Sequence, residues 1–251
     1  MTAPFAGRFH LLQPLGRGGM GEVFLARDAA TGLVCALKRL KPAPGDPHTV
    51  LREFEALTRV RHPAVVAVHE MGFAPDGTPW ITMEYLPGIP ADRAVARGDW
   101  RMAVRVAARV AHGLEALHAA RVVHGDLKPS NLMVIPAAGS SPLQAKLVDF
   151  GLAALLDRDR RGFRGTPGYA APEVARGAAQ AVSTDLYGLG ATLYQLVTGR
   201  APFEGADASS RLRRQLEGPP PTLPLEEAGA PPALVTLVMR AMAAEPAERP
   251  R

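Results

Sequence analysis

The sequence predicts an α+β fold in two parts, a small β-rich lobe followed by a larger and mostly helical lobe. The chain has 251 residues, of which 47% are hydrophobic, and this is enough to bury a substantial core. Up to about residue 85, short apolar runs are separated by glycine-rich turns, as is typical of strands. Beyond that point the apolar residues recur at helical spacing. This change of period is the main evidence for two lobes.

Five apolar runs predict the strands of the first lobe. They cover residues 8–16, 21–28, 33–40, 64–73 and 79–86. A segment with helical spacing, residues 50–63, lies between the third and fourth runs. We therefore expect a small sheet accompanied by one main helix.

The second lobe is predicted to begin with a long helix between residues 100 and 120. Its apolar stripe consists of Val106, Val110, Leu114 and Leu117. Two short strands are expected next, at residues 132–135 and 145–150. Helices dominate from Pro172 onward, at residues 183–199 and 232–244. The proline-rich segment 217–232 is expected to be a loop, with a polyproline docking segment as the alternative.

Charge and cysteine content exclude several kinds of site. The formal net charge is +5, but the basic residues are scattered, so we predict no nucleic-acid partner. A single cysteine, Cys35, allows no internal disulfide and no cysteine-based zinc site, which fits a reducing compartment. No apolar run reaches the roughly 18 residues of a membrane helix, and the N-terminus is too short and polar for a signal peptide. We therefore expect a cytoplasmic chain. The sequence does not indicate whether the chain is a monomer or an oligomer.

A glycine-rich motif joins the first two predicted strands. Gly16, Gly18 and Gly21 form the pattern G-x-G-x-x-G, and Val23 follows. The pattern alone is weak evidence because 25 of the 251 residues are glycine. Between two strands, however, its backbone N–H groups could close over phosphates without side chains in the way. A dinucleotide fold would require a helix next, and a Walker loop would require Lys-Ser or Lys-Thr, so both are excluded.

Lys38 is a lone lysine within an apolar strand. One reading is a side chain that extends from a strand edge to solvent. The other is a buried ammonium, which needs a carboxylate partner. Helical spacing places Glu53 on the same face as Leu57. Glu55 shares its face with the solvent residue Arg59, so we expect Glu53 to be the partner.

Polar residues are concentrated in the segment VVHGDLKPSN, residues 122–131, between two apolar runs. Further motifs follow it in order: DFG at residues 149–151, GTPGYAAPE at 165–173, TDLYGLG at 184–190 and AERP near the end. Together with the glycine motif and Lys38, these motifs resemble a eukaryotic-like (Hanks-type) serine/threonine protein kinase domain of the bacterial type, with HGD in place of HRD. The resemblance covers nearly the whole chain.

The resemblance implies a bilobal protein-kinase-like fold. The N-lobe is expected at residues 1–83, the hinge at residues 84–88 and the C-lobe at residues 89–251. The chain stops at AERPR, where the family normally adds another helix. Either the sequence is a piece of a longer protein or that helix is missing. The implied activity is transfer of the γ-phosphate of ATP to Ser/Thr hydroxyls of protein substrates, with Mg²⁺, or alternatively Mn²⁺, as the ion.

The catalytic residues are also implied by the resemblance. Asp126 is expected to be the base that accepts the proton of the substrate hydroxyl. Lys128 is expected to neutralise the γ-phosphate. Lys38, held by Glu53, is expected to bind the α- and β-phosphates.

Metal and nucleotide contacts follow in the same way. Asn131 and Asp149 are the expected ligands of Mg²⁺, which prefers oxygen donors. The expected nucleotide contacts are Gly16, Gly18, Gly21, Val23, Ala36, Lys38, Met83, Glu84, Leu86 and Met133. Structural roles are implied for His124 with Phe150 and Leu57, for Asp185 beneath the catalytic loop, and for the pair Glu173 and Arg249.

Gly125 stands where most active members of the family carry an arginine that receives a phosphorylated residue of the activation segment. Residues 152–164 contain no Ser, Thr or Tyr. The first hydroxyl after them is that of Thr166, which by resemblance contacts the catalytic aspartate and lysine. The arginines of the segment either dock against acidic groups or stay solvated. We therefore predict a kinase that is not switched by phosphorylation of its activation segment.

Two other functions remain as alternatives. The His-Gly-Asp order also resembles the catalytic loop of aminoglycoside and choline kinases, but these enzymes lack a peptide platform such as GTPGYAAPE. A pseudokinase that acts as a binding module is the second alternative, which Mg²⁺-dependent ATP turnover that is lost in Asp149→Asn would exclude. Tyrosine specificity is disfavoured by Lys128.

Overall fold

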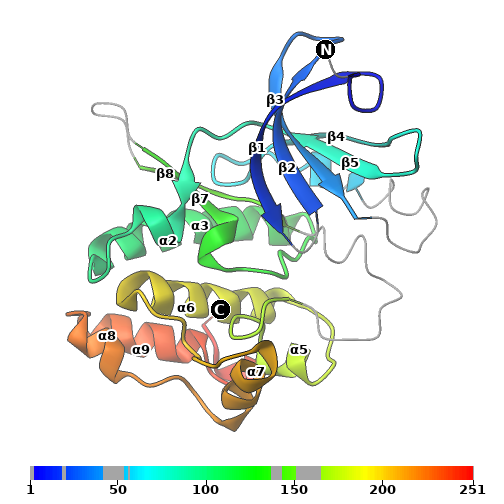
Figure 1. The fold of residues 1–251 in the computed structure, drawn as a ribbon. Helices are drawn as coiled ribbons and strands as arrows, with labels where there is room; N and C mark the ends of the chain where they lie inside the picture. The colour runs from blue at the N-terminus through cyan, green and yellow to red at the C-terminus, as the bar shows by residue number, and fades with distance from the viewer. Residues whose placement is uncertain are drawn as a thin grey trace. The chain divides into compact units, whose positions relative to one another are not determined.

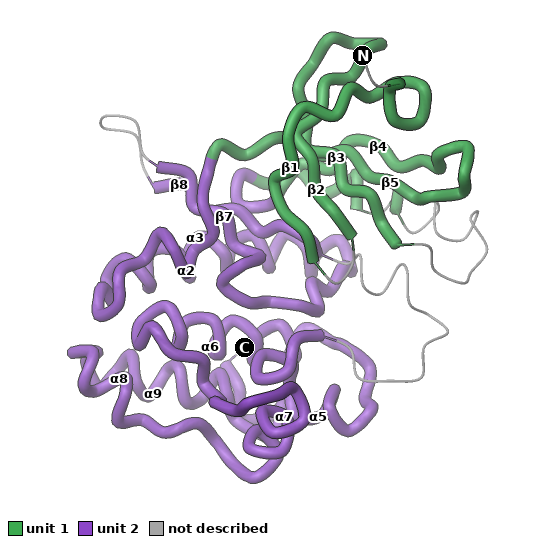
Figure 2. The backbone as a smooth tube through the Cα atoms, in the orientation of Figure 1, with its two compact units in different colours: residues 1–62, 66–87, 154–160 green, residues 63–65, 88–153, 161–251 purple. Residues whose placement is uncertain are grey.

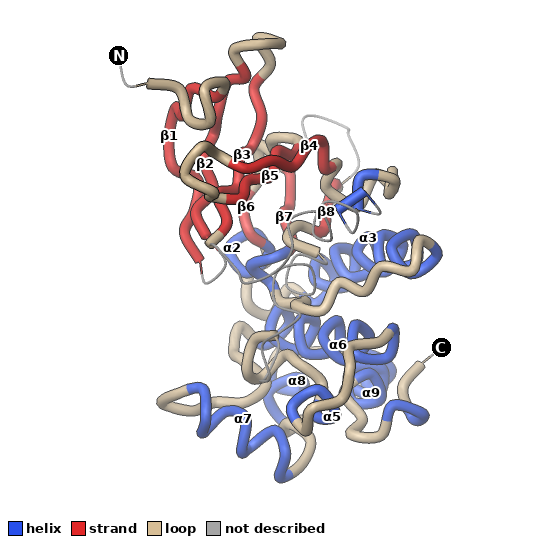
Figure 3. The backbone as a smooth tube through the Cα atoms, turned by 90° about the vertical axis from the view of Figure 1, so that its right-hand side faces the viewer, coloured by secondary structure: helices blue, strands red, loops and turns tan. Residues whose placement is uncertain are grey.

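The computed structural model describes residues 3–18, 21–41, 54–55, 57–136, 143–150 and 165–250. These residues form two compact units, shown in different colours in Figure 2. Unit 1 contains the described residues up to 62 together with 66–87, and unit 2 contains residues 63–65 and those from 88 onward. Strands dominate unit 1 and helices dominate unit 2 (Figure 3). The predicted α+β class is therefore confirmed.

Unit 1 is built on one antiparallel sheet of five strands (Figure 1). The order of the strands is β1-β2-β3-β5-β4, so β3 is the central strand. Their bounds are β1 Phe9–Gly18, β2 Gly21–Asp28, β3 Val34–Leu40, β4 Val68–Phe73 and β5 Pro79–Met83.

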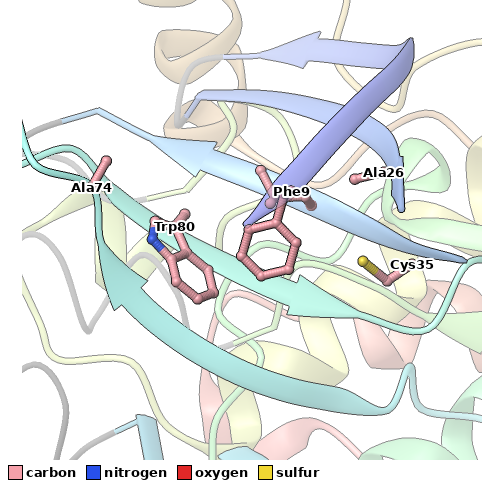
Figure 4. Packing of buried hydrophobic residues seen from close by; sticks show 6 residues of the cluster. Phe9, Ala26, Cys35, Ala74 and Trp80 are labelled. Atoms are coloured by element: carbon pink, nitrogen blue, oxygen red, sulfur yellow. The ribbon is translucent and has the colours of Figure 1, made fainter. Parts of the chain in front are cut away.

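The strands of this sheet have two different faces because successive side chains point to opposite sides. One face carries the core cluster Phe9, Ala26, Cys35, Leu37, Ala74 and Trp80 (Figure 4). The rings of Phe9 and Trp80 meet edge to face, with their centroids 4.9 Å apart, an arrangement that adds to the apolar burial. Cys35 is a buried member of this core, as expected for a small apolar residue.

Arg8 ties together three strands of unit 1 at one end of the sheet. Its Nε and Nη2 donate to the carboxylate of Asp28 at 2.8 and 2.7 Å, and its Nη1 donates to Glu70 Oε1 at 2.9 Å. The guanidinium holds the pKa of the Asp28 carboxyl well below its usual range. This bidentate pair fixes the start of β1 against the end of β2.

Unit 2 combines a small sheet with a set of helices. The sheet has the order β6-β7-β8. Its strands are β6 Ile89–Pro90, β7 Leu132–Ile135 and β8 Gln144–Leu147. The helices are α2 Ala91–Ala94, α3 Trp100–Ala119, α5 Pro172–Ala175, α6 Val182–Thr198, α7 Ala208–Glu217, α8 Leu223–Glu227 and α9 Pro232–Ala241, with 3₁₀ turns η1 Pro129–Asn131 and η2 Pro246–Glu248.

Helix α6 is the centre of unit 2 and packs against α3 and α9 (Figure 1). The predicted apolar stripe of α3 is buried in full, and its N-terminus is capped by Asp99, which accepts the N–H of Met102 at 3.0 Å. Gly190 lets α6 approach α9 closely, since a Cβ at this position would lie 2.8 Å from that of Ala241. The helix ends at Gly199 in the left-handed conformation, with φ 68°.

Several predicted boundaries are wrong. The strand expected at 64–73 begins only at Val68. Residues 63–65 belong to unit 2 instead, where the carbonyl of Ala64 accepts the N–H of Leu147 at 2.8 Å. The strand expected at 145–150 spans Gln144–Leu147. The loop expected at 217–232 contains α8, whose first turn holds a proline and whose Leu225 is fully buried. Among the described residues, no helix has the length and apolarity needed to span a membrane.

Candidate functional site

The polar segment 122–131 lies between α3 and β7 in unit 2 and is held from below by α6. Asp185, which is 1% exposed, accepts the N–H of His124 at 2.8 Å and the N–H of Gly125 at 2.9 Å. Nε2 of His118 lies 2.8 Å from the same carboxylate. The bracing role expected of Asp185 is therefore matched by its contacts.

Asp126, Lys128 and Thr166 form a closed set of contacts. The Lys128 ammonium donates to Asp126 Oδ2 at 2.6 Å and to Thr166 Oγ1 at 2.7 Å. Thr166 Oγ1 donates in turn to Asp126 Oδ1 at 2.7 Å. Because both carboxylate oxygens are held, the orientation of the Asp126 side chain is fixed. The contact of Thr166 with both residues is the one that the family resemblance implies.

Asn131 connects the η1 turn to the backbone of Asp126. Its Nδ2 donates to the Asp126 carbonyl at 2.8 Å and lies 3.3 Å from Asp126 Oδ2. The side chain is buried, so it has few alternative orientations. With the nitrogen used in this way, the carbonyl oxygen Oδ1 is the part of the amide that remains to bind an ion.

His124 is a buried link as well as a packing residue. Burial lowers the pKa of its imidazole, which favours the neutral ring. The N–H of Asp126 donates to Nδ1 at 3.3 Å, so the ring proton of the neutral form sits on Nε2, 3.1 Å from the Val148 carbonyl. The ring also lies 6.5 Å, centroid to centroid, from that of Phe150. His124 thus joins Asp126 to the segment that follows β8.

Asp149 adopts an uncommon backbone conformation. Its φ is 62°, in the left-handed region that few residues other than glycine occupy. Ala6 and Arg121 are the other non-glycine examples in the described part of the chain. Such strain is concentrated at functional sites in proteins, so it marks Asp149 as a candidate functional residue. Gly151, the last residue of the DFG motif, lies outside the described residues.

The nucleotide contacts predicted in unit 1 share one face of its sheet. Val23 pairs with Lys38, and Ala36 pairs with Met83, and cross-strand partners point to the same side. This is the face opposite the core cluster that contains Cys35. Lys38 is 3% exposed on the central strand β3, so the reading of a lysine at a strand edge is wrong. Glu53, its expected partner, lies outside the described residues.

The three motif positions differ in why they carry glycine. Gly21 has φ 150°, and a Cβ there would lie 1.9 Å from the carbonyl oxygen of Arg39, so the packing of β2 on β3 requires glycine. A Cβ placed on Gly16 or Gly18 would meet no atom of the described residues within 4 Å. Packing within the described part of the chain therefore does not explain glycine at these two positions, which is consistent with close approach of a ligand.

The remaining predicted contacts are Glu84, Leu86 and Met133. Glu84 is fixed on Ala67, donating its N–H to the Ala67 carbonyl at 2.9 Å and accepting the Ala67 N–H at its carboxylate at 2.8 Å. In the described part of the chain the N–H of Leu86 donates to no protein group. In unit 2, Met133 is half-buried on the face of β7 opposite the buried Leu132 and Val134.

Gln215 is a site residue that the sequence did not reveal. It is 3% exposed and lies on α7, where Oε1 accepts the N–H of Gly168 at 3.3 Å. Its Nε2 donates to the carbonyl of Ala170 and to the hydroxyl of Tyr187. Gln215 therefore fixes the backbone of the GTPGYAAPE motif. A single glutamine in a charged helical segment gives no periodic signal that would have identified it.

The expected pair of Glu173 and Arg249 is present, with Arg249 fully buried and Glu173 partly exposed. Nη1 and Nη2 of Arg249 donate to the two carboxylate oxygens at 2.6 and 2.7 Å. The same guanidinium, 0% exposed, also donates to the carbonyls of Ser183, Ala243 and Ala244. The bidentate geometry anchors the end of the described chain to the start of α5.

Comparison with known proteins agrees with this arrangement. The family model of the protein kinase domain matches residues 9–250. The chain is 39% identical to the serine/threonine-protein kinase pkn3 of Myxococcus xanthus, over 94% of this chain and 46% of that protein. It is 35% identical to the DNA damage-responsive serine/threonine-protein kinase RqkA of Deinococcus radiodurans, over 97% of this chain and 37% of that protein.

It is also 31% identical to the serine/threonine-protein kinase PknA of Mycobacterium tuberculosis, over 98% of this chain. The chain spans 59% of that relative's length, and less of the two others. The match of the family model extends over nearly all of the described residues. On this evidence the chain belongs to the protein kinase family.

Proposed function

We propose that this chain transfers the γ-phosphate of ATP to Ser or Thr hydroxyls of protein substrates. The observation that carries the proposal is the fixed carboxylate of Asp126, held by Lys128 and Thr166 on a buried loop. Phosphoryl transfer depends mainly on positioning and on neutralising the charge of the phosphate oxygens. Asp126 accepts the proton of the substrate hydroxyl, and Lys128 neutralises the γ-phosphate.

Asn131 and Asp149 are the proposed ligands of Mg²⁺, or alternatively Mn²⁺. An amide oxygen and a carboxylate are the donor types that Mg²⁺ uses, with phosphate oxygens and water completing its octahedron. The fixed Asn131 amide keeps its Oδ1 for the ion, and Asp149 supplies the carboxylate. When bound, the ion neutralises the charge on the phosphates of the nucleotide.

Unit 1 supplies the proposed nucleotide contacts. Val23, Ala36 and Met83 offer an apolar face to the adenine, and Leu86 offers its N–H, with the Glu84 carbonyl as the second polar contact. Lys38, paired with Glu53, binds the α- and β-phosphates, and the loop of Gly16, Gly18 and Gly21 covers the triphosphate. Met133 of unit 2 completes the adenine contacts. In this proposal the N-lobe is residues 1–83, the hinge 84–88 and the C-lobe 89–251.

The motif glycines give a test of the nucleotide site that separates binding from folding. Gly18→Ala is expected to raise the KM for ATP by about 3- to 10-fold, because its methyl group crowds the phosphates. Its melting temperature should be unchanged or slightly higher, since alanine restricts the unfolded chain. Gly21→Ala is the matched control and should instead lower the free energy of unfolding by about 1–3 kcal/mol through its clash with the Arg39 carbonyl. Equal destabilisation by both variants would contradict the assignment.

Protein substrates are proposed because the GTPGYAAPE motif is built as a rigid platform. Gln215 holds its backbone at two positions, and Glu173 at its end is paired with Arg249. The test is transfer of labelled γ-phosphate with Mg²⁺ to libraries of Ser/Thr peptides, Tyr peptides and small alcohols such as aminoglycosides. We expect labelled Ser/Thr peptides only. Labelling of the small alcohols alone would favour the small-molecule alternative, and ATP binding without transfer would favour the pseudokinase.

We further propose that activity does not depend on phosphorylation of the activation segment. Residues 151–164 lie outside the described residues, so the proposal rests on their lack of hydroxyls and on the absence of an arginine at Gly125. Phosphatase treatment of the purified protein should leave kcat unchanged. The proposal fails if treatment abolishes transfer and mass spectrometry assigns the lost phosphate to residues 152–169.

A further inference from the structure

Gly125 has a backbone conformation that glycine adopts easily, so contacts with other residues are needed to keep it fixed. Its φ is 79°, in the left-handed region. A glycine at this point leaves the peptide plane between residues 125 and 126 free to rotate, since no side chain restricts it. That plane directly precedes Asp126, so its orientation contributes to the direction of the carboxylate, together with the contacts of Lys128 and Thr166.

Both polar groups of this peptide plane are occupied by side chains. Nε2 of Gln180 donates to the carbonyl oxygen of Gly125 at 2.6 Å. On the other side of the plane, the N–H of Asp126 donates to His124 Nδ1 at 3.3 Å. The N–H of Gly125 is bound separately by Asp185 at 2.9 Å. Rotation of the plane would therefore break the Gln180 and His124 contacts together.

Gln180 also occupies the position that a side chain at residue 125 would need. A Cβ built on Gly125 would lie 2.4 Å from Oε1, 2.8 Å from Cδ and 2.9 Å from Nε2 of Gln180. The amide is the end of a flexible side chain and could move aside, but only by giving up its bond to the Gly125 carbonyl. Glycine at 125 and the glutamine contact thus depend on one another.

The amide of Gln180 comes from the turn between α5 and α6 and is half-buried. It lines a small cavity directly behind the catalytic loop, together with Asp126, Tyr169, Thr184 and Asp185. Since the cavity wall includes the peptide that carries Asp126, withdrawal of the amide would leave the Gly125 carbonyl facing this space. The contact is long-range, because donor and acceptor are 55 positions apart in the sequence.

We propose that Gln180 is a positioning residue for Asp126. Its amide fixes the carbonyl of Gly125 and fills the space that a side chain at residue 125 would occupy. The proposal rests on the kinase function proposed above. It assigns to the α5–α6 turn a direct influence on the orientation of the catalytic carboxylate. Gln180 itself touches neither nucleotide nor substrate in this role.

The first test is Gln180→Met, which keeps the length of the side chain but removes the N–H donor. We expect kcat to fall by about 3- to 10-fold, the equivalent of one hydrogen bond. The KM for ATP should be unchanged, and the melting temperature should fall only by the amount expected for one lost hydrogen bond. A merely structural role would lower the melting temperature in the same way but would leave kcat of the folded protein unchanged. Gln180→Glu should lower kcat further, since a carboxylate oxygen would face the carbonyl oxygen. Gln144→Met, at the exposed start of β8, is the control and should behave like wild type.

The second test uses the dependence between the two positions. Gly125→Ala should lower kcat by displacing the amide, and adding Gln180→Met should cause less further loss than it does alone. Full additivity of the two losses, or a wild-type kcat in Gln180→Met, would overturn the inference while leaving the kinase function intact.

A third measurement does not depend on catalysis. Hydrogen exchange of the Asp126 N–H, followed by NMR, should accelerate in Gln180→Met and not in Gln144→Met, because the peptide plane is released. Unchanged exchange would overturn the inference. If wild-type protein binds ATP but transfers no phosphate, the proposed function fails, and the exchange rates alone decide whether Gln180 holds the peptide.

Discussion

Asp126→Ala is expected to lower kcat by about 10²- to 10⁴-fold, the range for loss of a general base. The carboxylate is the acceptor for the substrate proton, and its two oxygens are already oriented by Lys128 and Thr166. The KM for ATP should change far less than kcat, because Asp126 itself is not among the proposed nucleotide contacts. Steady-state transfer of labelled phosphate to a Ser/Thr peptide measures both constants.

Thr166→Val separates the base from the residues that orient it. This variant removes one hydrogen bond to Asp126 but leaves the carboxylate, so the expected loss in kcat is roughly 10-fold. Circular dichroism and melting temperature should confirm that both variants are folded. Transfer that persists at the wild-type rate in Asp126→Ala would remove Asp126 from the mechanism.

Arg249→Ala is expected to lower the free energy of unfolding by about 3–5 kcal/mol, the range for breaking one member of a buried ion pair. The guanidinium is fully buried, and its loss leaves the Glu173 carboxylate and three backbone carbonyls without their donor. Urea unfolding followed by fluorescence measures the effect. The midpoint should fall while the slope stays constant.

Two variants serve as controls for this prediction. Arg249→Lys keeps the charge but loses the bidentate geometry, so it should fall between wild type and Arg249→Ala. Arg213→Ala, on the exposed face of α7, should change stability by no more than about 0.5 kcal/mol. A cost for Arg249→Ala as small as that of Arg213→Ala would show that the pair contributes little to the fold.

Much of the fold could be predicted because its elements leave a local pattern. Strand β3 is buried on both faces and therefore appears as a short apolar run, while the stripe of α3 follows from burial on one face and repeats at helical spacing. Helix α8 was missed because the prolines around it favour a loop, whereas the burial of Leu225 is a tertiary effect. Local composition cannot reveal a contact with a distant helix.

The site was predictable where residue types follow one another in a motif. Asp126, Lys128 and Asn131 lie within six positions, so their chemistry could be read together. Gln180 and Gln215 act through backbone groups 55 and 47 residues away, and neither belongs to a pattern. For Gly125, the sequence reveals only that the arginine usual in the family is absent. The structure adds its left-handed backbone and the amide of Gln180, so an arginine placed there would disturb the loop as well as add a charge.

The two faces of β3 place a limit on how this strand can evolve. Cys35 and Leu37 enter the core, while Ala36 and Lys38 lie on the opposite side. Insertion or deletion of one residue would exchange the faces and carry the ammonium of Lys38 into the core beside Phe9 and Trp80. Substitutions that keep residue size can accumulate in β3, but a change in its length cannot. Length variation in unit 1 is instead expected in turns such as residues 75–78, which lie outside the core cluster and between the ends of β4 and β5.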